Sequence, residues 1–465
     1  MAKPIRRLAF YEADKLLRHP KLRRVVILSG PRRVGKTTIS YQAIDALLRK
    51  HVPARQILYV SFDHPVLKLC DIGNIVDMYR KHFGDEHQTC YLFFDEVQYA
   101  SDWDAWLKTM YDRHPNCRIM ATGSASPAFS AKIGESGVGR WTRIHVPTLS
   151  FYEYVRLLRV PVPELAPNVK PTAPAGFDAK RIASLQAVLS PLQSHFYDYL
   201  LVGGFPETAL AGDVPLAQRL IREDVVDKVL KRDMVSLFGI RNVSELEKIF
   251  LYLCMTSGNL VQVESIAKEI GVSRPTVVSY LEFLELANLI YTSPPLASFG
   301  KKVLKARPKI YLADAAIRNA VLMTGREVFT DPAETGWIVE TTVYKHLFAF
   351  HYRDRPMIGY FRDPKSQKEI DIVVSLPSGR IAVEVKYRDE TGVSARDAIA
   401  DWAKADRTIA ILVTKRAEDF GKTDVAPDKA LLRIPAFAFL YLLGHAEQQG
   451  LVEDAEKQAE SEGPA

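Results

Sequence analysis

The sequence predicts a multidomain α/β protein, with a parallel sheet in its N-terminal part and a second α/β unit near its C-terminus. Three observations lead to this fold class. Short apolar segments alternate with helical patterns through residues 25–124, as in a parallel sheet whose strands are joined by helices. Residues 261–291 have a helix-turn-helix pattern, and residues 369–389 have the pattern of a strand hairpin. A chain of 465 residues accommodates two to four domains.

The composition is that of a globular protein, with 47% hydrophobic and 25% charged residues. The formal net charge of +7 and the pI near 9.0 favour an anionic partner. Four cysteines without CxxC spacing indicate reduced thiols and a cytoplasmic location. We expect no membrane partner, because no apolar run approaches transmembrane length and the N-terminus lacks a signal-peptide core.

The clearest motif follows an apolar strand pattern at residues 25–29. The segment GPRRVGKT (30–37) matches G-x-x-x-x-G-K-[ST], and a helical pattern follows it. In this context, backbone N–H groups at the helix start bind phosphates, Lys36 neutralises phosphate oxygens and Thr37 holds Mg²⁺. A Gly-rich turn without this role is the alternative, which the strand–loop–helix order disfavours. We therefore expect ATP and Mg²⁺ as cofactors. The predicted nucleotide contacts are Gly30, Pro31, Arg32, Arg33, Val34, Gly35, Lys36, Thr37 and Thr38.

A second apolar strand pattern, at residues 91–94, ends in Asp95 and Glu96. Such a run is typical of a central parallel strand. Beside the phosphate loop, Asp95 would coordinate Mg²⁺ through water, and Glu96 would polarise the attacking water. The alternative is that both acids only cap the next helix, which contains Trp103 and Trp106.

Two further strand patterns complete the predicted sheet. Residues 117–126 are apolar and end in polar residues that include Thr122 and Ser124. A strand lying beside both earlier motifs would bring such a side chain close to the γ-phosphate. Residues 56–65 supply another strand between the first two motifs.

These motifs resemble those of AAA+ superfamily ATPases of the AAA_14 type, over about residues 5–235. GPRRVGKTT, LFFDEVQ and ATGSAS stand in that family's order, followed by GESGVGRWTRIHVPTLSFYEY (134–154). The resemblance implies an ATPase, a P-loop NTP hydrolase that forms a homo-oligomer such as a hexameric ring. It makes Asp95 and Glu96 the Walker B pair, and Thr122 or Ser124 the sensor.

The same resemblance implies an arginine finger that reaches a neighbouring subunit. Arg140 is the first candidate for it and Arg143 the second. Local packing or pairing of Arg140 is the alternative. Thr148 stands where the family often has Leu, which affects no catalytic assignment.

The middle of the chain resembles a winged helix. Gly271 is expected to make the turn between two helices, and Ser273 to cap the second helix, with strands at residues 289–291 and 309–312. Glu282 and Glu285 on the exposed side of the second helix would repel DNA phosphates. Nonspecific phosphate contact through the wing is therefore favoured over base reading, and a structural or subunit-contact role is the alternative. The predicted DNA contacts are Arg274, Lys301, Lys302, Lys305 and Arg307.

The hairpin at residues 369–389 carries Asp371, Glu384 and Lys386, and a helical pattern before it carries Glu340. This order resembles the core of PD-(D/E)xK nucleases, a restriction-endonuclease-like α/β fold, although Ile370 precedes the acid where Pro is usual. The resemblance implies a second Mg²⁺ or Mn²⁺ held by the acids, with the lysine orienting water. A solvated charge cluster on a fold that has lost activity is the alternative. From about residue 190 the chain also resembles the DUF4143 region, which often follows such ATPases.

The expected domain boundaries follow from these assignments. They are an ATPase core at 1–158, a Pro-rich loop at 159–181, a helical lid and connector at 182–240, a winged helix at 241–325, a nuclease-like domain at 326–446 and a disordered acidic tail at 447–465.

Three functions fit this organisation. The first is an oligomeric, Mg²⁺-dependent ATPase that acts as a motor or switch on DNA, in unwinding, branch migration or remodelling. The second is a signalling or assembly ATPase whose C-terminal domains bind protein and whose nuclease fold is inactive. The third is a metal-dependent nuclease regulated by ATP.

Overall fold

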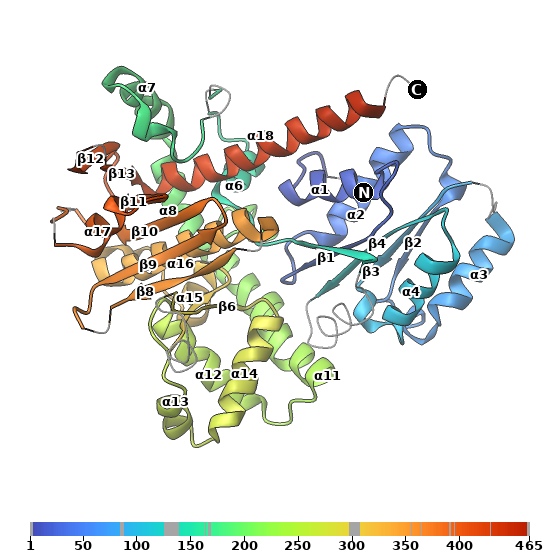
Figure 1. Ribbon diagram of the computed structural model, residues 1–465. Helices are drawn as coiled ribbons and strands as arrows, with labels where there is room; N and C mark the ends of the chain where they lie inside the picture. Colours follow the sequence, from blue (N-terminus) through green and yellow to red (C-terminus); the bar gives the residue numbers. More distant parts are fainter. Residues whose placement is uncertain are drawn as a thin grey trace.

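A computed structural model describes residues 3–83, 88–124, 139–162, 164–165, 169–296, 307–354, 356–363, 365–389, 392–394, 396–427 and 429–462. The two larger β-sheets lie on opposite sides of the molecule, and a group of helices that includes α11 to α14 lies below and between them (Figure 1). The long helix α18 crosses above both parts (Figure 1). None of the described helices is long and apolar enough to cross a membrane.

The N-terminal sheet contains five parallel strands in the order β2-β3-β4-β1-β5. The strands are β1 (Val25–Gly30), β2 (Ile57–Ser61), β3 (Cys90–Asp95), β4 (Cys117–Ser124) and β5 (Trp141–His145). The helices around them are α1 (Leu8–Leu17), α2 (Lys36–Arg49), α3 (Ile72–Phe83) and α4 (Trp103–Arg113). This arrangement confirms the predicted parallel α/β fold, including the position of β4 between the strands that carry the two main motifs.

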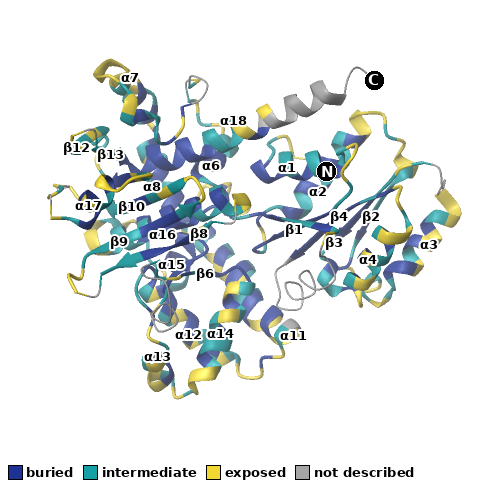
Figure 2. Cartoon of the chain, in the orientation of Figure 1, coloured by how far each residue is buried: buried dark blue, intermediate teal, exposed yellow. Residues whose placement is uncertain are grey.

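Successive side chains along each strand point to opposite faces of the sheet. Helices cover both faces, so both sets of side chains are buried. Val26 and Leu28 pack with α1 and α2, whereas Val25 and Ile27 pack with α3 and α4. Figure 2 shows the resulting continuous burial of the central strands. Because the strands are parallel, their carboxyl ends meet at one edge, where Gly30 is in register with Ser124.

A series of helices follows the sheet. They are α6 (Phe151–Leu157), α7 (Ala179–Leu189), α8 (Leu192–Val202), α9 (Pro206–Ala209), α10 (Val214–Leu220) and α11 (Met234–Phe238). Between α10 and α11 the backbone forms two π-helical segments, η5 (Ile221–Asp227) and η6 (Val229–Asp233). Such wide turns are rare and are frequently found at functional sites. The described residues of the Pro-rich segment include the short 3-10 helix η4 (Ala173–Gly176) and the start of α7.

The next elements have the order expected of a winged helix. They are α12 (Val243–Thr256), α13 (Val263–Ile270), α14 (Arg274–Leu286), β6 (Ile290–Ser293) and β7 (Lys309–Leu312). Gly271 ends α13 with a φ of 80°, and Ser273 accepts a hydrogen bond from Thr276 N at the start of α14. The strands β6 and β7 pair antiparallel. Lys301, Lys302 and Lys305 lie outside the described residues.

The C-terminal part is a six-stranded mixed sheet in the order β12-β13-β11-β10-β9-β8. Its helices are α15 (Ala315–Leu322), α16 (Pro332–His351), α17 (Ala398–Lys404) and α18 (Ala436–Glu462). Its strands are β8 (Met357–Arg362), β9 (Glu369–Leu376), β10 (Gly379–Lys386), β11 (Thr408–Thr414), β12 (Gly421–Ala426) and β13 (Lys429–Pro435). The predicted hairpin is present as β9 and β10.

The predicted disordered tail from residue 447 differs from the structure. Helix α18 continues to Glu462, and Leu451 within it is buried. The segment is rich in Glu, Ala, Lys and Gln, which are strong helix formers. Helix propensity and the attached buried helix therefore outweigh the polarity that suggested disorder.

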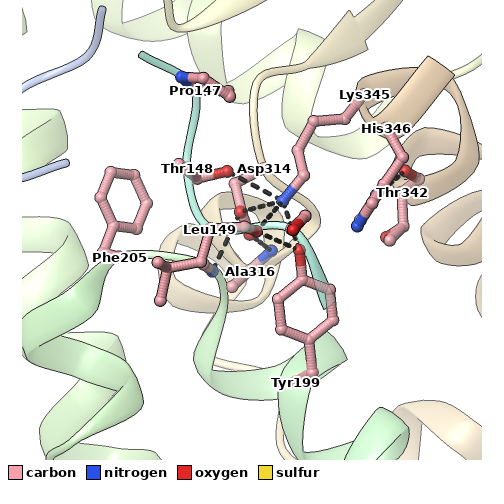
Figure 3. Close-up of polar contacts among 12 residues, drawn as sticks. Pro147, Thr148, Leu149, Tyr199, Phe205, Asp314, Ala316, Thr342, Lys345 and His346 are labelled. Carbon is pink, nitrogen blue, oxygen red and sulfur yellow. Dashed lines mark hydrogen bonds and ion pairs between the residues drawn. The ribbon is translucent and has the colours of Figure 1, made fainter. Parts of the chain in front are cut away.

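A buried polar junction joins the two halves of the chain (Figure 3). Lys345 of α16 donates hydrogen bonds to Thr148 Oγ1 at 2.8 Å, Tyr199 OH at 2.6 Å and Asp314 Oδ2 at 2.9 Å. Thr148 follows β5, Tyr199 lies in α8 and Asp314 caps α15. The Lys345–Asp314 ion pair has side chains only 3% and 4% exposed. At Thr148, the departure from the family's Leu therefore supplies a polar partner for this buried lysine.

Candidate nucleotide-binding site

A cavity of about 960 Å³ lies at the carboxyl edge of the N-terminal sheet. The start of α2, the end of β3 and the helices after β5 line it. The predicted residues that line it are Arg32, Arg33, Gly35, Lys36, Thr37, Thr38, Asp95 and Glu96. Val34 is instead fully buried. The loop and the acid pair, 58 residues apart between Thr37 and Asp95, thus form one site.

The phosphate loop has the backbone that the motif requires. Gly35 has a φ of 94°, and α2 begins at Lys36, so the N–H groups of the first helical turn face the cavity edge. A Cβ at Gly30 would lie 2.0 Å from Val146 O, so only glycine fits there. This close packing holds the loop against the segment after β5.

Lys36 is folded back onto its own loop. Its side chain is buried, and its Nζ donates to Gly30 O at 3.0 Å and to Pro31 O at 2.7 Å. Burial lowers the pKa of Lys36, while the nearby carboxylates of Glu96 and Asp95 oppose this. The phosphate oxygens of a bound nucleotide would compete for this ammonium against two neutral carbonyls.

Asp95 is surrounded by hydroxyl groups. Thr37 Oγ1 donates at 2.9–3.0 Å, Thr122 Oγ1 at 2.6 Å and Tyr59 OH at 3.1 Å. Burial raises the pKa of Asp95, and the hydroxyl donors of Thr122, Thr37 and Tyr59 partly offset this effect. A carboxylate beside a threonine hydroxyl is a hard-oxygen donor set that suits Mg²⁺, so Thr37 and Asp95 fit the predicted metal role. Sequence reasoning missed Tyr59, which only the pairing of β2 with β3 brings close.

Glu96 and Thr122 are linked across neighbouring strands. The Glu96 backbone N donates to Thr122 Oγ1 at 3.0 Å, and Gln98 Nε2 donates to Glu96 Oε2 at 2.6 Å. The capping alternative for the two acids is wrong, because the N-cap of α4 is Asp102. Of the two predicted sensor residues, Thr122 contacts Asp95. Ser124 ends β4 opposite Gly30, but its side chain lies outside what the structure describes.

Two arginines of the loop contact the helical segment beyond it. Arg32 forms a bidentate ion pair with Asp233 of η6, with both nitrogen–oxygen distances at 2.5 Å. Arg33 pairs with Glu207 and with Asp224 of η5, each at 3.1 Å. The π-helical segments therefore lie directly against the loop. The acids were not recognisable in the sequence as loop partners, because they lie about 170 to 200 residues away.

The finger candidates lie on either side of the start of β5. Arg140 precedes β5, at the amino edge of the sheet, and pairs with Asp112 at 2.9 Å. The six residues of β1 separate this edge from the phosphate loop, a length of about 20 Å. Arg143 points within its own chain and donates to Ser29 Oγ at 3.1 Å. Arg140 therefore has the local pairing foreseen as the alternative and lies far from its own loop.

The predicted nuclease residues form two groups. Glu340 and Asp371 both contact Lys309 of β7, which sequence reasoning missed. Glu384 instead pairs with Lys386 at 3.3 Å, and Lys386 pairs with Asp397 at 2.9 Å. Within the described residues, no three or more His, Cys, Asp or Glu side chains are grouped to hold a metal ion. The expected second metal is therefore not supported.

The described DNA-contact candidates lie at the surface. Arg274 pairs with Glu264 at 2.8 Å, with side chains 64% and 70% exposed, and Arg307 is also exposed. Glu285 is not directed at a DNA surface, because it accepts hydrogen bonds from Thr292 N and Oγ1. Its expected repulsion of phosphate is thus weaker than the sequence indicates.

Three protein-family models match three successive segments of the chain. Residues 22–155 match the AAA domain model AAA_14. Residues 193–327 match a domain of unknown function, DUF8612, and residues 335–436 match another, DUF4143. The DUF4143 match therefore begins later than residue 190, where the resemblance was expected to start.

Two relatives are similar in sequence over most of the chain. An uncharacterized protein of Haemophilus influenzae is 24% identical over 81% of this chain and 94% of its own length. An uncharacterized protein of Methanocaldococcus jannaschii is 24% identical over 89% of this chain and 87% of its own length. Matches of this extent include both the AAA domain and the C-terminal regions.

Solved structures of AAA+ proteins are also similar. ORC1 of Aeropyrum pernix, in complex with DNA, is 11% identical over 67% of this chain and 90% of its own, with a TM-score of 0.29. AMPPCP-bound DnaA of Aquifex aeolicus is 16% identical over 61% and 89%, with a TM-score of 0.25. Scores this low support no functional transfer. From its motifs, strand order and family matches, the chain has an AAA domain with the AAA+ P-loop fold at residues 22–155, and a DUF4143 region in its C-terminal part.

Proposed function

We propose that this protein is an Mg²⁺-dependent, ATP-hydrolysing switch or motor that acts on DNA as a homo-oligomer. One observation carries the enzymatic part of the proposal. Lys36, Thr37, Asp95 and Glu96 come from two separate segments and line one cavity, and Thr122 from a third segment donates a hydrogen bond to Asp95.

Each of these side chains has a distinct role in the proposed hydrolysis. The N–H groups of the first turn of α2 and the Lys36 ammonium bind the phosphates. Mg²⁺, held through Thr37 and Asp95, would supply charge neutralisation at the phosphate oxygens. Glu96 accepts a hydrogen bond from the attacking water and orients it, while Gln98 holds one of its oxygens 2.6 Å away. Thr122 keeps Asp95 and the Glu96 backbone aligned.

The loop arginines provide a way for nucleotide to move the helical segment. Arg32 and Arg33 are bound to Asp233, Glu207 and Asp224, and phosphate oxygens attract the same guanidinium groups. Nucleotide binding would therefore weaken these pairs and shift η5 and η6. This exchange of partners supports a switch rather than a passive nucleotide store.

The position of Arg140 supports the homo-oligomer in this proposal. Hydrolysis in this class of site is accelerated by an arginine aimed at the γ-phosphate. Arg140 lies at the opposite edge of its sheet from its own loop. A second copy of the chain would bring Arg140 to the phosphate, whereas Asp112 holds it in the single chain.

DNA is the proposed partner because of the basic charge and the helix-turn-helix segment. The net charge is +7, and Arg274 and Arg307 are exposed in this region. The alternative is a signalling or assembly ATPase whose C-terminal domains bind protein. It is favoured by the ion pairing of Glu340 and Asp371, which occupies the nuclease-like residues.

The deciding experiment measures ATP hydrolysis with and without single-stranded, duplex and branched DNA. We expect at least one DNA form to change the rate, and DNA affinity to fall steeply with salt as phosphate contacts are screened. The Lys36→Ala variant separates the two steps, since it should bind DNA without hydrolysing ATP. Absence of both DNA binding at low salt and any rate change would favour the assembly alternative.

A further inference from the structure

Lys309 is a buried lysine at the centre of the C-terminal acidic cluster. It is the first residue of β7, and its side chain is only 5% exposed. Its Nζ lies 2.6 Å from Glu369 Oε1, 3.1 Å from Glu340 Oε1 and 3.4 Å from Asp371 Oδ1. Three carboxylates therefore enclose the Lys309 side chain.

The same oxygens are the ones that a nuclease metal would need. The nuclease resemblance assigns the metal to Asp371 and Glu384, with Glu340 completing the set, and Lys309 Nζ contacts two of these three acids, Asp371 and Glu340. A divalent ion binds carboxylate oxygens at about 2.1 Å, so it cannot share this space with an ammonium.

The remaining hydrogen bonds hold the acids in this arrangement. Tyr311 OH donates to Glu340 Oε1 at 2.7 Å, and Val385 N donates to Asp371 Oδ2 at 2.9 Å. Lys386 is bound to Asp397 and Glu384 instead of facing Asp371. Lys309 and these hydrogen bonds thus give Glu340 and Asp371 partners from the protein itself, as buried carboxylates require.

We propose that Lys309 is an internal counter-ion that takes the place of a catalytic metal and ties strand β7 to the nuclease-like sheet. The residues present in this chain therefore do not fit the metal ion that the nuclease resemblance implies. The domain serves as a scaffold held together by an ion cluster, and it does not cleave DNA by a metal-dependent route. This inference is independent of ATP hydrolysis, so the two can fail separately.

The test uses Mn²⁺ as the probe on the full-length protein without nucleotide, with binding followed by calorimetry and by the electron paramagnetic resonance of the free ion. Wild-type protein should bind no Mn²⁺ at Asp371. Wild type and Asp371→Asn should therefore bind Mn²⁺ equally. Lys309→Met should gain such a site, in the micromolar to millimolar range typical of carboxylate sites. The double variant Lys309→Met/Asp371→Asn should lose it again.

The matched control is Lys368→Met, which removes one exposed lysine of the same domain, paired with Asp401 at 2.6 Å. It should gain no Mn²⁺. An Asp371-dependent Mn²⁺ site in wild-type protein would overturn the proposal, as would a folded Lys309→Met variant that gains none. If Lys309→Met does not fold, the wild-type comparison with Asp371→Asn still decides the question.

Discussion

Two sites in this chain combine a buried lysine with carboxylates near strand ends, but they arrange the charges differently. In the nucleotide pocket, Lys36 bonds to two backbone carbonyls, and Asp95 bonds to hydroxyl groups. In the C-terminal cluster, Lys309 bonds directly to three carboxylates. Neutral partners can be exchanged for phosphate and metal at little electrostatic cost, whereas breaking a buried ion cluster leaves charges unpaired. The same residue types therefore indicate a binding site in one place and a structural tie in the other.

The broadest expected effect is that of Lys36→Ala, which should impair both nucleotide binding and hydrolysis. Without the ammonium, phosphate charge loses its partner, and we expect a loss of activity of at least about 10²-fold, together with weaker nucleotide binding. Steady-state ATPase rates and nucleotide titration measure this. Lys50→Ala, at the exposed end of the same helix, is the control and should be unaffected. Wild-type turnover by Lys36→Ala would show that the cavity is not the hydrolytic site.

Arg140→Ala tests whether the site is completed by a second copy of the chain. Loss of a finger arginine reduces hydrolysis by about 10³-fold or more. Oligomers mixed from Arg140→Ala and Lys36→Ala subunits should regain activity at interfaces where the intact phosphate loop of one subunit meets the intact Arg140 of its neighbour. Asp112→Ala should remain active, because it removes only the local partner. Mixed oligomers that stay inactive would argue for the local role of Arg140.

Glu96→Gln separates nucleotide binding from hydrolysis. The neutral amide cannot accept a proton from the attacking water. We therefore expect hydrolysis to fall by about 10²-fold or more, with ATP binding retained. Single-turnover kinetics and the amount of bound ATP after gel filtration measure this. The variant should accumulate as an ATP-bound assembly. Normal turnover would reduce Glu96 to a structural residue at the end of β3.

Two expected effects on stability, neither of which involves activity, test the comparison most directly. Lys309→Met should lower the free energy of unfolding by about 3–5 kcal/mol, because it leaves buried carboxylates without a cation. Lys36→Met should lower the free energy of unfolding by less, about 1.5–3 kcal/mol, since it removes hydrogen bonds from a charged donor to neutral carbonyls. Urea unfolding followed by circular dichroism measures both. Equal losses would mean that the two lysines have equivalent structural roles.

The local sequence by itself determined the parallel sheet, the phosphate loop and the β9–β10 hairpin. Each depends on short-range patterns, namely an apolar strand followed by GPRRVGKT, or two strands around a turn. The meeting of Thr37 with Asp95 was also foreseeable, because the carboxyl ends of parallel strands share one edge. The tail was predicted wrongly because its polarity was weighed above its helix propensity.

Only the tertiary structure decided which charged groups meet. Asp233 reaches Arg32 across 201 positions, and Lys309 reaches Asp371 across 62 positions. No local pattern encodes such pairs, because they depend on how whole helices and sheets pack. A carboxylate is a metal ligand or an ion-pair partner according to which cation the fold places beside it, and in the C-terminal cluster the fold places Lys309 there.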